Sequence, residues 1–118
     1  MKLSIELYEW DIYLCIGKDI YEAKLKELNQ DELISDGYDG AHSYFSHNFR
    51  FNSVIGLNID ELKKYPNYES VAEKTLIHEI THAMQYIKQA LNLDCKENEA
   101  TIMEHLYDKF MPYLRERL

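Results

Sequence analysis

Residues 75–89, with the sequence TLIHEITHAMQYIKQ, combine a helical pattern with two histidines four positions apart. At about 100° per residue, this helix separates into two faces. The apolar face carries Ala72, Leu76, Ile77, Ile80, Ala83, Met84, Ile87, Ala90 and Leu91. The opposite face carries Thr75, His78, Glu79, His82, Gln85, Tyr86 and Gln89. A helix with one such apolar face packs against a sheet or other helices, so this segment organises the core.

The two histidines of this helix, His78 and His82, lie one turn apart on the same face, so both imidazoles can reach one ion. Glu79 lies to one side of them and can reach a water bound to that ion without being a ligand. Two neutral nitrogen ligands and an adjacent base are the groups that metal-assisted hydrolysis requires. The alternative is a pair of surface histidines beside a solvated glutamate.

A catalytic zinc ion normally has three protein ligands and one position left for water, so a third ligand is needed. In metzincin proteases a glycine and a third histidine follow the second histidine at fixed spacing. Gln85 and Lys88 occupy those positions here, which excludes that class. The C-terminal segment offers Glu97, Glu99, Glu104, His105 and Asp108.

A helical projection of this last segment selects Glu99 as the third ligand. The residues within roughly 60° of Glu99 are all apolar: Ile102, Met103, Leu106 and Phe110. The other acidic residues, Glu97, Glu104 and Asp108, fall on the opposite face, and His105 lies well off the apolar stripe. An ionised carboxylate on a buried stripe is costly unless it is paired or bound to metal. The alternatives are a Glu99 that forms a salt bridge at the edge of the stripe, and Cys95 as the ligand.

The N-terminal half predicts strands and one helix. Residues 2–16 read as a strand whose parity changes near Tyr8 and Glu9, which indicates a bulge or bend. Residues 18–33 read as an amphipathic helix and 35–40 as a loop. Two strands follow, 41–46 and 49–58, around His47 and Asn48. The residues expected on one face of the second are Phe49, Phe51, Ile55 and Leu57.

The C-terminal half predicts helices. A helical turn at 59–67 is stopped by Pro66. Ser70 and Glu73 form a capping box that starts the long helix, which should continue to about Leu91. Asp94 is a second N-cap, for a helix that starts at about Cys95 and bends before Pro112. The order of elements predicts an α+β domain.

Composition limits the class of protein. The 118 residues fit a single domain, 1–118, and the two cysteines form no disulfide framework. The formal charge of -8, without a basic run, makes the chain a poor candidate for binding phosphate backbones, so we expect no direct binding of nucleic acid. No stretch approaches the length of a membrane span, and acidic residues interrupt the apolar N-terminus, so we expect no export signal, no membrane association and a cytoplasmic location.

With these residues placed, the chain resembles the zincin metallopeptidases, specifically the gluzincin arrangement of His-Glu-x-x-His on one helix and a glutamate on the next. The segments HEITH and ENEA are similar to those of small intracellular proteins of bacteria and phages, including the ImmA/IrrE type, over about residues 50–110. The resemblance implies a zincin-like fold, with a small mixed or antiparallel sheet packed against both helices. It implies that His78, His82 and Glu99 bind Zn²⁺, that Glu79 is the general base, and that a peptide or protein is the substrate. It also implies that residues 52–58 form the edge strand along which that peptide pairs.

Several points stay open at this stage. The donor that stabilises the developing oxyanion has four candidates: Tyr86, Tyr107, His47 and His105. The chain ends soon after the second helix, so we expect no separate domain to form the far wall of a cleft. One alternative is therefore a zincin-fold protein that binds metal for structure, or inhibits a host factor by protein contact. A metal-independent scaffold is another, and the sequence indicates no oligomeric state.

Overall fold

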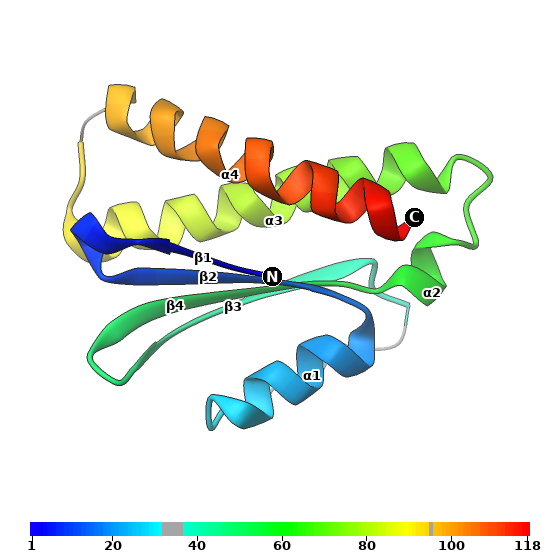
Figure 1. Ribbon diagram of the computed structural model, residues 1–118, viewed down its shortest axis with the longest axis horizontal. Helices are drawn as coiled ribbons and strands as arrows, with labels where there is room; N and C mark the ends of the chain where they lie inside the picture. Colours follow the sequence, from blue (N-terminus) through cyan, green and yellow to red (C-terminus); the bar gives the residue numbers. More distant parts are fainter. Residues whose placement is uncertain (32–36, 95) are drawn as a thin grey trace.

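The computed structural model describes residues 1–31, 37–94 and 96–118. It has the predicted α+β architecture, with helices on both faces of one four-stranded sheet (Figure 1). Helix α1 (Lys18–Glu27) covers one face, and helices α3 (Tyr68–Leu91) and α4 (Lys96–Arg117) cover the other. The short helix α2 (Ile59–Leu62) connects the sheet to α3 and ends before Pro66, as predicted.

The sheet is mixed, with the strand order β1-β2-β4-β3. Its strands are β1 (Lys2–Ile5), β2 (Trp10–Ile16), β3 (Gly40–His47) and β4 (Arg50–Leu57). Strand β4 pairs in parallel with β2 and antiparallel with β3, so it is a central strand. The prediction that residues 52–58 form an edge strand is therefore wrong. Of the strands that the structure describes, β1 and β3 lie at the edges.

The predicted single strand 2–16 is in fact an antiparallel pair. A 3₁₀ turn at Glu6–Tyr8, followed by Glu9 in the left-handed region at φ 49°, reverses the chain direction. Lys2 then lies opposite Tyr13 in the sheet. The parity change in the sequence marks this turn and not a bulge, because the chain doubles back instead of continuing in the same direction.

The β3–β4 hairpin agrees with the prediction except at its turn. Asn48 and Phe49 both have positive φ, 52° and 63°, and form the two-residue connection. The Phe49 side chain is fully exposed, so its predicted place on the core face is wrong. Phe51, Ile55 and Leu57 do share the face that packs under α3 and α4.

The helices differ from the prediction mainly at their ends. Helix α1 ends at Glu27, short of the predicted end, and residues 32–36 lie outside the described ranges. Helix α3 begins at Tyr68 after Asn67, so the predicted capping box is wrong: Glu73 instead accepts a hydrogen bond from Arg115, Nε to Oε1 2.6 Å. Its predicted end at Leu91 is confirmed, and Asn92 follows in the left-handed conformation that commonly terminates helices.

Cys95, directly before helix α4, lies outside the described residues, so the predicted Asp94 cap and the predicted start at Cys95 cannot be compared with the structure. The helix continues through Pro112 to Arg117. Leu106, Phe110 and Leu114 on this helix are buried in the main core. The predicted apolar stripe of the C-terminal segment thus faces the protein interior.

The main core lies between the sheet and helices α3 and α4. On α3 the predicted apolar face is largely confirmed, with six buried members: Ala72, Leu76, Ile80, Ala83, Met84 and Ile87. Ile77 and Ala90 are exposed, contrary to prediction. A second cluster, which includes Tyr21, Leu25 and Val54, fills the space between the sheet and α1.

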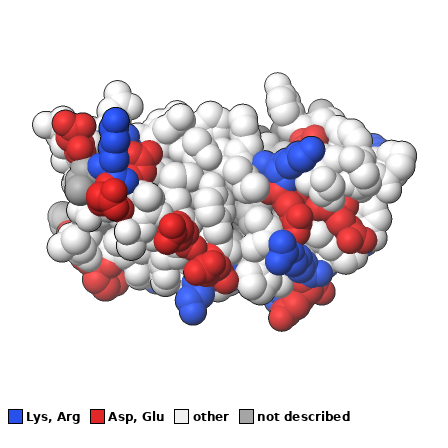
Figure 2. All heavy atoms as spheres, turned by 90° about the horizontal axis from the view of Figure 1, so that it is seen from above, with Lys and Arg blue, Asp and Glu red and all other residues white. Residues whose placement is uncertain are grey.

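The face formed by α3 and α4 mixes acidic and basic side chains (Figure 2). Among the described residues, two ion pairs link the helices, Arg115 with Glu73 and Lys88 with Glu99. In the described ranges, none of the helices is long and apolar enough to cross a membrane.

Candidate metal centre

Helix α3 runs without interruption through the segment that carries His78, Glu79 and His82. Residues 68–91 contain no glycine or proline, so nothing in the sequence breaks the helix. The hydroxyls of Thr75 and Thr81 donate to carbonyls one turn earlier, at 2.8 Å each, and so are satisfied within the helix. His78 and His82 therefore lie one turn apart on a regular α-helix, as predicted.

The imidazoles of His78 and His82 point toward one another. Their Nε2 atoms lie 3.0 Å apart, and the two rings are nearly perpendicular at 89°. Two zinc–nitrogen bonds of about 2.0–2.1 Å at a tetrahedral angle place their nitrogens about 3.3 Å apart. The pair therefore fits two positions of one zinc ion with little adjustment.

The ring of His82 is oriented by its other nitrogen. Nδ1 of His82 lies 3.2 Å from Oε1 of Gln85. Because an amide oxygen can only accept, Nδ1 carries the proton and Nε2 keeps its lone pair. Histidines that bind metal commonly have such a partner on the nitrogen that faces away from the ion.

Glu79 lies closer to the core than the projection predicted. It is 7% exposed, although the neighbouring His78 is exposed and His82 is half-buried. Burial raises the pKa of its carboxyl group, and the nearby His78 and His82 oppose this shift. A buried carboxylate with a raised pKa is a better proton acceptor than a solvated one, and the alternative of a solvated glutamate does not describe this residue.

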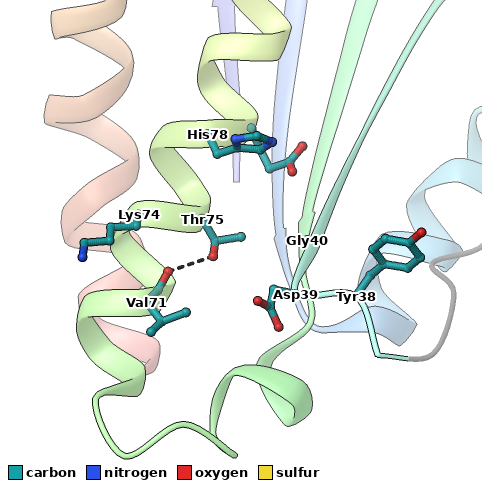
Figure 3. A pocket seen from close by; sticks show the side chains of 8 residues that line it. Tyr38, Asp39, Gly40, Val71, Lys74, Thr75 and His78 are labelled. Carbon is teal, nitrogen blue, oxygen red and sulfur yellow. Dashed lines mark hydrogen bonds between the residues drawn. The ribbon is translucent and has the colours of Figure 1, made fainter.

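A hollow of about 390 Å³ lies between the first half of α3 and the start of β3 (Figure 3). It is lined by Tyr38, Asp39, Gly40, Val71, Lys74, Thr75, His78 and Glu79. A Cβ atom at Gly40 would fall 2.8 Å from Cγ2 of Thr75 and 3.1 Å from the Gly56 carbonyl oxygen. Glycine at this position therefore lets β3 lie close against α3 at one end of the histidine site.

Glu99 is not brought to the histidine pair. Its Oε2 lies 2.8 Å from Nζ of Lys88, and both side chains are about one-third exposed, 29% and 35%. Lys88 is six residues beyond His82, and so lies about 120° away from it around the helix. The pair matches the alternative of a salt bridge at the edge of the apolar stripe.

The ion pair places Glu99 on the flank of α3 that faces α4, away from the histidines. Across residues 1–31, 37–94 and 96–118, no three His, Cys, Asp or Glu side chains are gathered as a ready ligand set. Cys95, the other predicted ligand, lies outside these residues. Two of the three predicted ligands and the predicted base are thus adjacent, and the third ligand is elsewhere.

His42 on β3 is a residue of this region that the sequence reasoning missed. Its ring lies 5.4 Å from that of Tyr86, and its Nε2 is buried without a hydrogen-bond partner in the described part of the chain. Burial lowers the pKa of His42 to about 4, and the charge of His82 adds to the shift. Pairing with Ile55 in the hairpin puts His42 on the side of the sheet that α3 and α4 cover, which strand parity could have indicated.

The candidate oxyanion donors are distributed over several elements. Tyr86 lies on α3, where its ring packs between those of His42 and Tyr44, each at 5.4 Å. His47 is the last residue of β3, and both His105 and Tyr107 lie on α4. The contact with His42 places Tyr86 beside the site.

No protein-family model, curated protein or solved structure matches the chain.

Proposed function

We propose that this protein is a zinc-dependent metallopeptidase with a zincin-like arrangement, in which His78 and His82 hold the ion and Glu79 is the general base. One observation carries the proposal: two imidazole nitrogens 3.0 Å apart on one helix face, with a buried carboxylate at the adjacent position. A helix that served only as a surface element would have no need to bury Glu79 beside its histidines.

The proposed chemistry assigns one role to each residue. Zinc, when bound, lowers the pKa of water to about 7 and polarises the scissile carbonyl. His78 and His82 hold it through Nε2, and Gln85 keeps the proton of His82 on Nδ1. Glu79 accepts the proton of the attacking water and passes it to the leaving amine.

The edge strand β3 supplies a binding surface for an extended peptide. It starts at the hollow that His78 and Glu79 line, and among the described strands it pairs only with β4. A peptide that added to this edge as a further strand would run beside α3 and bring its backbone to the histidines. We therefore transfer the substrate-binding role from residues 52–58 to β3. The charge of -8 favours neutral or cationic peptides.

Glu99, the predicted third ligand, lies apart from the two histidines. For Glu99 to bind the same ion, its carboxylate would have to leave Lys88 and reach the other flank of α3. The predicted gluzincin ligand set thus draws support from this geometry for His78 and His82, while Glu99 remains a prediction from the sequence.

The ion pair of Glu99 also favours a second candidate function. A chain in which Lys88 neutralises this carboxylate could bind metal through its histidines and act by contact with another protein, without hydrolysis. The position of Glu79 argues against this candidate, because a structural metal site has no use for a buried base beside it.

Digestion of an unbiased peptide library separates these functions. Wild-type protein, purified without a histidine tag and loaded with zinc, should cleave peptides, and Glu79→Gln should keep its zinc but cleave none. The matched control is Glu69→Gln, in the exposed first turn of the same helix, which should cleave like the wild type. Cleavage by Glu79→Gln at the wild-type rate would refute the mechanism. Zinc binding without cleavage by the wild type would favour the second candidate.

A further inference from the structure

We propose that His42 of β3, and not Glu99 of α4, is the third protein ligand of the ion held by His78 and His82. The inference rests on the metal centre of the proposed function and names the residue that completes it. The proposed ligand set is then three imidazoles from two elements, an arrangement that also leaves one coordination position for water.

The hairpin register places His42 on the same side of the sheet as α3. In the hairpin register His42 lies opposite Ile55, whose side chain is in the core beneath α3 and α4. The His42 ring therefore lies between the edge strand and α3, where it contacts Tyr86. Tyr86 follows His82 by one helical turn, so His42 and the histidine pair share a flank of α3.

The flank occupied by α4 is a different one. Two ion pairs fix α4 against α3, Glu73 with Arg115 and Lys88 with Glu99. The residues of α3 that take part, 73 and 88, lie within about 60° of each other around the helix axis, and His82 lies about 120° or more from both. The fold thus brings β3 to the histidines and keeps α4 away from them.

Two polar atoms on β3 lack partners in this region. Nε2 of His42 and the hydroxyl of Tyr44 are buried, and neither has a hydrogen bond within the described ranges. Both rings pack against Tyr86. Buried polar atoms nearly always have a hydrogen-bond partner. Two unpartnered atoms at successive inward-facing positions of one strand therefore indicate that an ion or polar group binds between β3 and α3.

The two candidate ligands differ in the partners that they already have. Nε2 of His42 has no hydrogen-bond partner in the described part of the chain, so its lone pair can be offered to a metal ion. Glu99 has already satisfied its charge with Lys88. Because the three rings are not gathered as a ready ligand set among the described residues, the proposal requires the His42 side chain to turn toward His82.

Zinc affinity of the full-length chain tests the assignment. His42→Ala and His82→Ala should each weaken Zn²⁺ binding at least about 100-fold, since losing a direct ligand costs more than losing its hydrogen-bond partner. Glu99→Gln and the matched control His47→Ala, on the same strand as His42, should stay within about threefold of the wild type. Circular dichroism of each variant checks that it is folded.

His42→Cys gives a readout that does not depend on affinity. Loaded with Co²⁺, this variant should show a sulfur-to-cobalt charge-transfer band, because thiolate replaces imidazole at the ion. The wild type, which contains Cys15 and Cys95, is the baseline and should show none.

Each outcome decides between the assignments. Folded His42→Cys with bound cobalt but no such band overturns the inference, as does loss of zinc in Glu99→Gln with retention in His42→Ala. Either result leaves the proposed function intact, and the second result assigns Glu99 as the third ligand. A wild-type protein that binds no zinc overturns the proposed function, and this inference with it.

Discussion

Nδ1 of His82 donates its proton to Oε1 of Gln85, 3.2 Å away and three residues along the same helix. This bond leaves Nε2 of His82 as a lone pair aimed at His78. Since removing such an orienting partner typically costs 10–100-fold in metal affinity, we expect Gln85→Ala to weaken zinc binding by about that factor. A competition titration with a chromophoric zinc chelator measures it.

The matched control for this prediction is Gln89→Ala. Gln89 is exposed and one turn further along α3, so its loss should leave zinc affinity unchanged. Equal affinities for Gln85→Ala and the wild type would show that the hydrogen bond does not orient a ligand.

Metal binding should stabilise the folded chain, because an unfolded chain cannot hold two imidazoles in this geometry. At a zinc concentration 100 times the dissociation constant, the gain in the free energy of unfolding is about 2.7 kcal/mol. We therefore expect the melting temperature to rise with zinc and to fall again when a chelator is added. His82→Ala should melt at one temperature in both conditions. A zinc-dependent rise in the melting temperature of that variant would show that zinc binds at another site.

The local elements of this fold could be predicted from the sequence because each depends on neighbours along the chain. The helical periodicity of apolar residues predicted the two faces of α3, and their alternation along the chain predicted the β3–β4 hairpin. The central position of β4 in the sheet was not predicted. The continuous run Val54–Leu57 is buried throughout, which is typical of a strand covered on both faces, and that signal indicates a central strand.

The third ligand could not be predicted, because it depends on how distant elements pack. A projection of α4 shows that Glu99 shares a face with Leu106 and Phe110, and the structure agrees that this face packs inward. The projection does not show which flank of α3 the helix meets. That choice is made by the sheet order and by ion pairs such as Lys88 with Glu99, which link residues far apart in sequence.

The environment of Asp11 leads us to expect that the free energy of unfolding depends on pH. Burial raises the pKa of its carboxyl group, but hydrogen bonds from Arg50 and Ser4 outweigh this effect and bring the pKa below its usual value. A carboxyl group with a lowered pKa in the folded state stabilises the fold above the unfolded-state value of about 3.9, and this contribution is lost as the pH falls through the folded-state pKa.

The variant that tests this dependence is Asp11→Asn. It should unfold at a lower urea concentration than the wild type at pH 7, and the difference should shrink below about pH 3.9, where the unfolded carboxyl group is protonated. Asp108→Asn, at an exposed position on α4, is the control and should show neither effect. A difference for Asp11→Asn that stays constant with pH would rule out the carboxylate as its source.

Gly56 makes room for the side chain of Tyr21, which packs against β4. A Cβ atom at position 56 would lie 2.4 Å from Cδ1 and 2.5 Å from Cγ of that ring. Tyr21 is buried in the cluster beneath α1, so we expect Gly56→Ala to lower the free energy of unfolding by about 2–3 kcal/mol. In a Tyr21→Ala background the same substitution should cost far less, because the clash is gone. Equal costs in the two backgrounds would contradict the packing argument.

The turn residue Phe49 should be replaceable with a gain in stability. Asn48 and Phe49 both have positive φ, and the two-residue turn of this kind favours asparagine followed by glycine. The Phe49 side chain is fully exposed and loses no packing on removal. The left-handed conformation costs a residue with a Cβ atom about 1–2 kcal/mol, whereas glycine loses about 0.5–1 kcal/mol through its freer unfolded state. Phe49→Gly should therefore raise the free energy of unfolding by about 0.5 kcal/mol, measured by urea titration.

Phe49→Ala distinguishes the backbone effect from the loss of the ring. Alanine removes the aromatic group but keeps the Cβ atom, so its stability should equal that of the wild type. If Phe49→Ala gained as much as Phe49→Gly, the cost would lie in the exposed ring and not in the left-handed backbone. If both variants were destabilised, the ring would have to contribute packing in the folded state, contrary to its full exposure.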